Sequence, residues 1–169
     1  MKTLVVYYSY SGRTETVART IAEALDADIR RIEEVKPRNG FAQLYLDGGM
    51  AAGRDKCSEI KPCDIDIDEY DRIFIGTPNW ASKPAPAVNA FITGTDLAGK
   101  EVIVFCTTGG NMGVNNLLAN FTGKVEDKCG RVVGSFAIRS SQLNDRELAE
   151  KAREALLGLP VFTREKVAA

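Results

Sequence analysis

The chain has 169 residues, 27% of them charged, and a formal net charge of −1. A chain of this length folds as one domain with a sizeable core, and its near-neutral balance offers nothing that attracts nucleic acid or an anionic membrane. Its apolar runs fall well short of the ~20 residues that cross a bilayer and its N-terminus lacks a secretory signal, so we expect one cytoplasmic domain over residues 1–169, with no membrane insertion.

Strand-like and helix-like patterns alternate along the chain. Apolar runs of strand type occupy residues 4–8, 70–76, 101–106 and 130–138, and residues 28–35 alternate like a strand exposed on one side. Such alternation predicts an α/β fold, with a parallel sheet covered on both faces and residues 28–35 at its edge.

Four helical patterns separate or follow these strands. The first places Val17, Ile21 and Leu25 on one face, and the second runs from Pro84 or Pro86 to Ile92 and stops at Gly94. The third places Leu117, Leu118 and Phe121 on one face. The last begins at Asn144, with Glu147 completing a capping box, and runs to about Leu157. Residues 41–60 fit less well, because helical spacing there is interrupted by glycines. They form either an interrupted helix or an ordered excursion over the sheet edge.

Residues 9–14 break the first strand pattern into a short polar loop, Ser-Tyr-Ser-Gly-Arg-Thr, before the first helix. Unpaired amides and the positive end of a helix dipole suit a terminal phosphate. The loop lacks the Gly-Lys-Ser/Thr of a Walker loop and the three glycines of a dinucleotide fingerprint. The alternative is an ordinary turn capped by a hydroxyl residue.

Two further loops follow strand patterns, at residues 77–83 and 107–113. The C-terminal ends of parallel strands meet at one edge, where ligands bind. Trp80, the only tryptophan, lies in the first of these loops, where a stacked planar ligand would cover it; alternatively it folds back onto the core. The second is glycine-rich, which lets backbone amides approach a ring; alternatively it is a plain turn. Together the three loops outline a mononucleotide site, for which we prefer FMN.

Cysteine and histidine content limits the chemistry further. The four cysteines, at positions 57, 63, 106 and 129, form no Cys-x-x-Cys pair, and the chain has no histidine. We therefore expect no zinc site and no catalytic Ser-His or Cys-His pair. Cys106 is expected in the core, and Cys57 and Cys63 could be oxidised together. If the protein is an enzyme, we expect a cofactor to carry the difficult step.

These motifs resemble those of the flavodoxin family. Residues 8–15, Tyr-Ser-Tyr-Ser-Gly-Arg-Thr-Glu, are similar to its hydroxyl-rich phosphate loop, residues 76–80, Gly-Thr-Pro-Asn-Trp, to its loop with a flavin-stacking tryptophan, and residues 107–110, Thr-Thr-Gly-Gly, to its third loop. The resemblance implies a three-layer, doubly wound, five-stranded parallel sheet with strand order 2-1-3-4-5 and noncovalent FMN. Residues 41–60 resemble the longer second crossover of a subgroup.

The resemblance also implies which residues bind FMN, and it implies no catalytic side chain, because the flavin carries the redox chemistry. The phosphate would be bound by Ser9, Tyr10, Ser11, Gly12, Arg13 and Thr14, the isoalloxazine would be lined by Thr77, Pro78, Asn79 and Trp80, and its pyrimidine edge would meet the amides of Thr107, Thr108, Gly109 and Gly110.

Two departures from electron-carrier flavodoxins bear on function. Asn111 and Met112 stand where a second aromatic is usual, and the chain lacks the strong acidity of the carriers. We therefore expect a second-electron potential less negative than that of an acidic carrier, with Lys83 contributing. The preferred function is electron transfer with redox partner proteins, a reductase and an acceptor. The alternatives are an NAD(P)H-dependent FMN oxidoreductase with a quinone-type acceptor, and a flavin-free interaction module.

Overall fold

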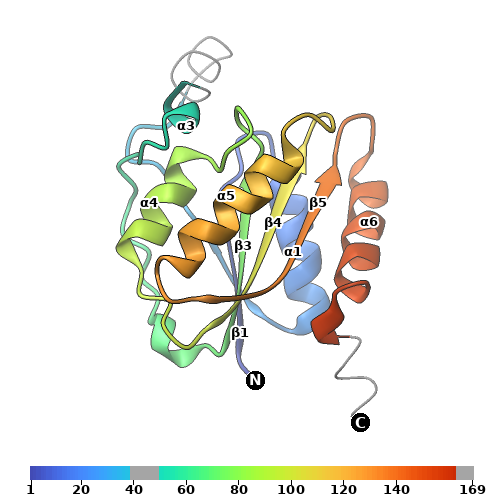
Figure 1. Ribbon diagram of the computed structural model, residues 1–169. Coiled ribbons are helices and arrows are strands. Elements are labelled where there is room, and N and C mark those ends of the chain that lie inside the picture. The colour runs from blue at the N-terminus through green and yellow to red at the C-terminus, as the bar shows by residue number, and fades with distance from the viewer. Residues whose placement is uncertain (39–49, 163–169) are drawn as a thin grey trace.

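A computed structural model describes residues 1–38 and 50–162 as a three-layer α/β domain. Its five strands are parallel and lie in the order β2-β1-β3-β4-β5, which confirms the expected topology. All five end at the same edge of the sheet, at the top of Figure 1. The strands are β1 (Thr3–Tyr7), β2 (Asp28–Arg31), β3 (Arg72–Pro78), β4 (Glu101–Thr108) and β5 (Arg131–Arg139).

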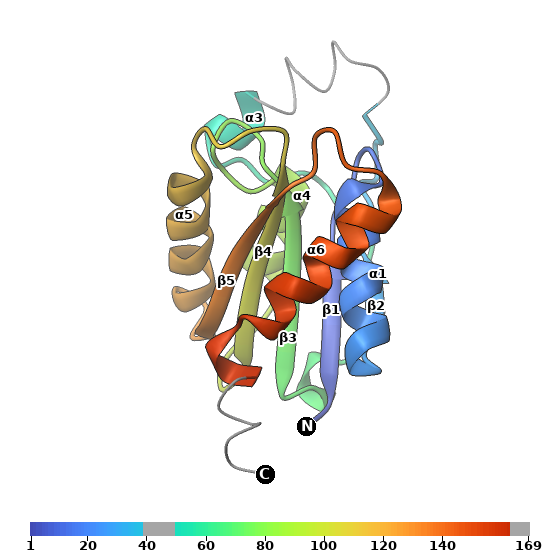
Figure 2. The same cartoon turned by 90° about the vertical axis from the view of Figure 1, so that its right-hand side faces the viewer.

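Four helices cover the two faces of this sheet. Helices α4 (Pro86–Gly94) and α5 (Val114–Glu126) pack on one face, and α1 (Arg13–Leu25) and α6 (Asp145–Leu157) on the other (Figures 1 and 2). A single turn, α3 (Met50–Gly53), precedes β3, as does a 3₁₀ turn, Ile67–Glu69. No helix of the described ranges is both long and apolar enough to span a bilayer.

The core divides into two clusters because side chains alternate along each strand. In β1, Leu4 and Val6 join the cluster under α4 and α5, whereas Val5 and Tyr7 join the cluster under α1 and α6. The central strands are buried on both faces, as near-continuous apolar runs predict for a parallel sheet. Cys106 of β4 is fully buried, as expected, and all four cysteines are free thiols.

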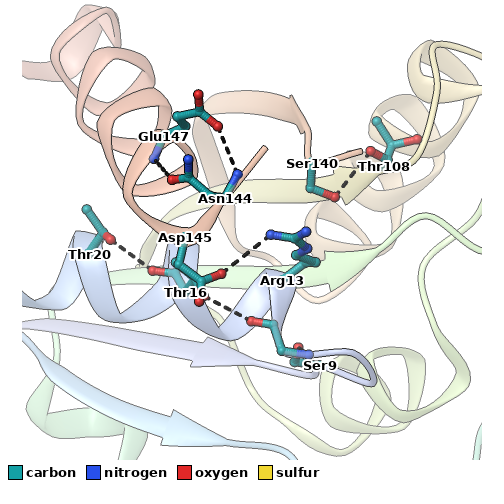
Figure 3. Close-up of polar contacts among 10 residues, drawn as sticks. Ser9, Arg13, Thr16, Thr20, Thr108, Ser140, Asn144, Asp145 and Glu147 are labelled. Atoms are coloured by element: carbon teal, nitrogen blue, oxygen red, sulfur yellow. Dashed lines mark hydrogen bonds and ion pairs between the residues drawn. The ribbon is translucent and has the colours of Figure 1, made fainter. Parts of the chain in front are cut away.

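The helices begin where local chemistry predicts. Gly12 precedes α1 with a φ of 87°, and Pro86 is the first residue of α4. At the start of α6, the Asn144 side chain accepts the Glu147 N–H at 3.0 Å, and the Glu147 carboxylate accepts the Asn144 N–H at 2.9 Å (Figure 3). This reciprocal pair is the predicted capping box.

Strand boundaries differ from the sequence prediction. β2 ends at Arg31 instead of residue 35, because the chain then turns and Glu34 pairs with Ile60 in an isolated antiparallel bridge. β3 and β4 each extend two residues further, where Thr77 pairs with Cys106 and Pro78 with Thr107. Both threonines are therefore strand residues and not loop residues. Of the segment 41–60, residues 41–49 lie outside the described ranges.

Candidate functional site

Three loops leave the carboxyl ends of the neighbouring strands β1, β3 and β4. We name them loop 1 (residues 8–12), loop 2 (residues 79–85) and loop 3 (residues 109–113). Loop 2 contacts both of the others. Tyr10 of loop 1 lies against Trp80 of loop 2, with ring centroids 6.3 Å apart. The Asn79 side-chain amide of loop 2 donates to the Met112 carbonyl of loop 3 at 3.2 Å. The predicted site residues therefore lie at one edge of the sheet.

Several backbone N–H groups of loop 1 and of the start of α1 are unpaired. The Ser9 hydroxyl accepts the Gly12 N–H at 3.1 Å and so folds the loop. Within the described residues, no acceptor pairs with the backbone N–H groups of Tyr10, Ser11, Arg13 and Thr14. These amides surround the N-terminus of α1, where the helix dipole adds partial positive charge. Four unpaired donors at a helix start suit an anion with several oxygens, such as a phosphate ester.

Charged side chains flank loop 1 but are already paired. The Arg13 guanidinium lies 3.4 Å from the Asp145 carboxylate at the start of α6 (Figure 3). Arg31 of β2 donates to the Ser9 carbonyl at 3.0 Å and pairs with Glu15 at 3.1 Å. The unpaired backbone N–H groups, and not these paired cations, are therefore the donors that loop 1 and the start of α1 leave free.

A pair of buried hydroxyls joins the start of α1 to the end of β4. The hydroxyl oxygens of Thr14 and Thr107 are 2.8 Å apart, and both side chains are buried. Both threonines were predicted as ligand residues. Their mutual hydrogen bond fixes the distance between the start of α1 and the end of β4.

Loop 2 is a tight hairpin that carries the tryptophan. Trp80 and Lys83 exchange backbone hydrogen bonds of 3.2 and 3.0 Å across Ala81 and Ser82, which both have positive φ. Two successive positive φ values are typical of a type I′ turn. Gly113 of loop 3, also with positive φ, lies directly against Ser82, and a side chain there would collide with the serine.

Trp80 is half-buried at the edge of the core, between the two alternatives that the sequence left open. Its ring meets that of Tyr8 edge-on at 5.6 Å, and the Arg38 guanidinium lies over it at 5.8 Å. Tyr10, about one-third exposed at 37%, approaches from loop 1. The indole therefore packs against core residues while remaining at the loop edge.

Asn79 joins loop 2 to loop 3 through several hydrogen bonds. Its amide nitrogen donates to the Thr108 hydroxyl at 3.3 Å as well as to the Met112 carbonyl. Its amide oxygen accepts the Ser82 N–H at 3.1 Å, and its own N–H donates to the Thr107 carbonyl at 2.8 Å. Sequence reasoning assigned Asn79 to the ring lining; in the structure its side chain sets the distance between the two loops.

The remaining predicted residues divide into paired and open positions. Thr77 is fully buried, and its hydroxyl bonds within its own segment, to the Pro78 carbonyl and the Ala85 N–H. The Thr108 hydroxyl donates to the Gly110 carbonyl at 2.7 Å. Gly109 and Gly110 border open space, with no atom within 4 Å of where a Cβ would stand. Loop 3 therefore exposes backbone, together with Met112, which is 89% exposed.

A buried network beneath Trp80 was not predicted from the sequence. The Tyr8 hydroxyl donates to Glu34 at 2.9 Å, and Arg38 donates to Glu34 and to Ser58, both at 3.1 Å. Burial, followed by the charge of Glu34, raises the pKa of Tyr8 well above its usual value, so its hydroxyl keeps its proton. Glu34 and Arg38 are four residues apart, but Tyr8 and Ser58 are 26 and 20 residues from their partners, and no local pattern indicates those two contacts.

Lys83, expected to lend positive charge to the ring site, is paired. Asp55 accepts from Lys83 and lies 3.2 Å from Lys124 of α5. Burial raises the pKa of Asp55, but the hydrogen bonds and charges of the two lysines outweigh it, so that the pKa lies below its usual value. The three groups together carry one net positive charge instead of two, which weakens but does not remove the expected effect of Lys83.

Two cavities lie near or below this edge. One, of about 290 Å³, adjoins loop 1 and is lined by Tyr8, Tyr10, Arg31 and Arg38 among others. A larger one, of about 420 Å³, lies between residues 60–68 and the C-terminal end of α4. The larger cavity contacts none of the three loops. We place the candidate site at the loops, because the unpaired amides and the tryptophan lie there.

Comparison with known proteins agrees with this geometry. The flavodoxin family model matches residues 2–135. A Lactobacillus acidophilus NCFM flavoprotein in complex with FMN has a TM-score of 0.68 and 24% identity, over 90% of this chain and 98% of that chain. Oxidised flavodoxin 2 from Bacillus cereus has a TM-score of 0.56 and 21% identity, over 92% and 96%. The Trp repressor binding protein from Bacillus subtilis has a TM-score of 0.62 and 14% identity, over 91% and 99%.

At these identities the solved structures bear on the fold alone. The family model is the stronger finding, because it spans most of the chain, from β1 through most of β5. It includes loops 1, 2 and 3 in full. This protein therefore belongs to the flavodoxin family.

Proposed function

We propose that this protein binds FMN noncovalently at the three loops and transfers electrons through it, as a carrier between redox partner proteins. The observation that carries the proposal is loop 1, whose unpaired backbone N–H groups surround the start of α1 within reach of the tryptophan loop. Family membership supports it, as does the FMN complex of the L. acidophilus flavoprotein.

The residues of the site fit the parts of FMN. A phosphate dianion accepts the N–H groups of loop 1 and gains from the helix dipole. Trp80 offers a flat surface for a planar ring, and Gly109 and Gly110 let backbone amides approach it. FMN, when bound, supplies the redox chemistry that the side chains of this chain lack. The protein's part is to bind the phosphate, orient the ring and hold the loops apart.

A second function, an NAD(P)H-dependent FMN oxidoreductase with a quinone-type acceptor, is favoured by loop 3. No aromatic side chain stands there; Asn111 and Met112 are exposed instead. A ring bound against loop 3 would keep one face accessible to a second planar molecule. We rank the carrier first, because the family and loop 1 support it directly.

Titration of the apoprotein with FMN tests cofactor binding, with quenching of FMN fluorescence as the readout. We expect saturable quenching with one FMN per chain; fluorescence that stays unquenched with the protein in excess would end the proposal. Anaerobic addition of NADH or NADPH to the FMN-loaded protein then separates the two functions. A carrier should keep its yellow colour until a reductase is added, whereas an oxidoreductase should bleach directly.

A further inference from the structure

The connection between β5 and α6 lies beside loop 3, although no sequence motif singled it out. Ser140, the first residue after β5, is buried. Its backbone N–H donates to the Thr108 carbonyl at 2.8 Å, and its hydroxyl donates to the same carbonyl at 3.3 Å (Figure 3). Both donors of this serine therefore hold one peptide group at the end of β4.

The direction of that carbonyl determines where the next N–H points. The Thr107 carbonyl accepts the Asn79 N–H and so faces β3, and the Thr108 carbonyl faces Ser140, on the β5 side. The described chain contains no cis peptide bond, and in a trans peptide the N–H points opposite to the carbonyl. The N–H of Gly109 therefore points toward the β3 side, where loop 2 lies.

No strand meets this N–H on the β3 side. In a regular parallel ladder the next acceptor on β3 would be the Asn79 carbonyl, but the chain leaves the sheet there and enters the Trp80 hairpin. Within the described residues the Gly109 N–H has no acceptor, and the space around Gly109 is open. An unpaired donor thus faces the gap between loops 2 and 3.

We propose that Ser140 is a positioning residue of the FMN site, which holds the Thr108–Gly109 peptide so that the Gly109 N–H faces an acceptor atom of the ring. The inference rests on the proposed function for the identity of the ligand. It adds the β5–α6 connection to the site as a fourth segment that acts through loop 3 without touching the ligand.

The serine hydroxyl matters because a glycine-rich loop does not fix its own peptide planes. Two donors on the Thr108 carbonyl oppose a flip of the peptide, since the flipped carbonyl would lose both. Ser140→Ala keeps the backbone donor and removes the hydroxyl. Ser140→Thr keeps both. Ser141→Ala is a matched control, because the Ser141 hydroxyl bonds to Arg139 at 3.1 Å and not to loop 3.

The first test needs no FMN. In the apoprotein labelled with ¹⁵N-glycine, Ser140→Ala should shift or broaden the Gly109 amide resonance, and Ser140→Thr should restore it. Ser141→Ala should leave it in place. A Gly109 resonance that is the same in Ser140→Ala and in the wild type would overturn the inference, whatever the protein binds.

The second test measures ligand affinity. Ser140→Ala should weaken FMN binding about 3- to 10-fold, as expected for one lost hydrogen bond. It should weaken riboflavin binding by the same factor and shift the second-electron potential of the bound flavin. Ser140→Thr should restore all three values. A loss for FMN but not for riboflavin would assign Ser140 to the phosphate half and overturn the inference. A wild-type chain that binds no FMN would overturn the proposed function instead, and with it the ligand half of this inference.

Discussion

Loop 1 and the pair formed by loops 2 and 3 treat their polar groups in opposite ways. In loop 1, backbone N–H groups at the start of α1 have no acceptor among the described residues. In loops 2 and 3, Asn79 and Thr108 bond to one another and to the neighbouring backbone. Loop 1 and the start of α1 present several free backbone donors, whereas the side chains between loops 2 and 3 hold each other and the Gly109 N–H is the free donor described there.

This difference corresponds to two kinds of recognition. The charge of a phosphate dianion compensates for the free-energy cost of desolvating several amides, so these amides can be unpaired before the phosphate binds. A planar ring gains mainly from contact area and stacking, which depend on the width of the gap. Several free donors at a helix start therefore indicate where a charged group binds, and paired side chains indicate where spacing is controlled.

The largest expected effect comes from removing the phosphate from the ligand. Riboflavin should bind about a thousandfold more weakly than FMN, or about 4 kcal/mol, because several charge-assisted hydrogen bonds to loop 1 are lost. Competitive titration by fluorescence measures both affinities. Equal affinities for the two ligands would show that loop 1 binds no phosphate.

Substitution of the loop-bridging asparagine should have the next largest effect. Asn79→Ala removes the side-chain bonds to Thr108, Met112 and Ser82, so we expect FMN and riboflavin to bind about 10- to 100-fold more weakly. Asn116→Ala, on the exposed side of α5, is the control. If Asn79→Ala affected FMN alone, loops 2 and 3 would not form the ring half.

A glycine pair tests loop 1 itself. Gly12→Ala places a side chain at a φ of 87°, a strain of roughly 1–2 kcal/mol, and should weaken FMN binding about 5- to 30-fold as the loop relaxes. Gly99→Ala is the matched control, since Gly99 has a φ of 74°, equally open surroundings and a place before β4, at the opposite edge of the sheet. Urea unfolding should show a similar loss of stability in both variants. Loss of FMN affinity in Gly99→Ala too would mean that the effect is one of folding.

The smallest expected effect concerns Asp55 and pH. The pKa of Asp55 in the folded protein lies below its usual 3.8. At pH values between the folded and the unfolded pKa, the unfolded state therefore binds more protons, and the pairing with Lys83 and Lys124 stabilises the fold fully only at pH values above 3.8. Asp55→Asn should therefore be less stable than the wild type at pH 6, and the difference should shrink as the pH falls below about 3.8. Urea unfolding at several pH values measures this difference. A difference that is constant down to pH 3 would show that the carboxylate charge contributes nothing.

Features built from neighbouring residues were correctly predicted from the sequence alone. The polar turn between β1 and α1, the capping box of α6 and the proline start of α4 each depend on a few consecutive residues and on local hydrogen bonding, whereas phosphate binding by loop 1 stays a prediction. The strand order came from a family resemblance, and the structure confirms it. Near-continuous apolar strand runs separated by helical patterns predicted the parallel sheet and its core, because a strand buried on both faces has few polar positions.

Only the tertiary structure decided how the loops are held. Asn79 and Thr108 are 29 residues apart, Ser140 and Thr108 are 32 apart, and each pair meets because β3, β4 and β5 end side by side. Hydroxyl and amide side chains form such bonds wherever the fold brings them together, so no local sequence pattern distinguishes a residue that contacts the ligand from one that only holds two loops together. The sequence determined which edge of the sheet is chemically unusual; strand pairing determined which of its polar groups remain free.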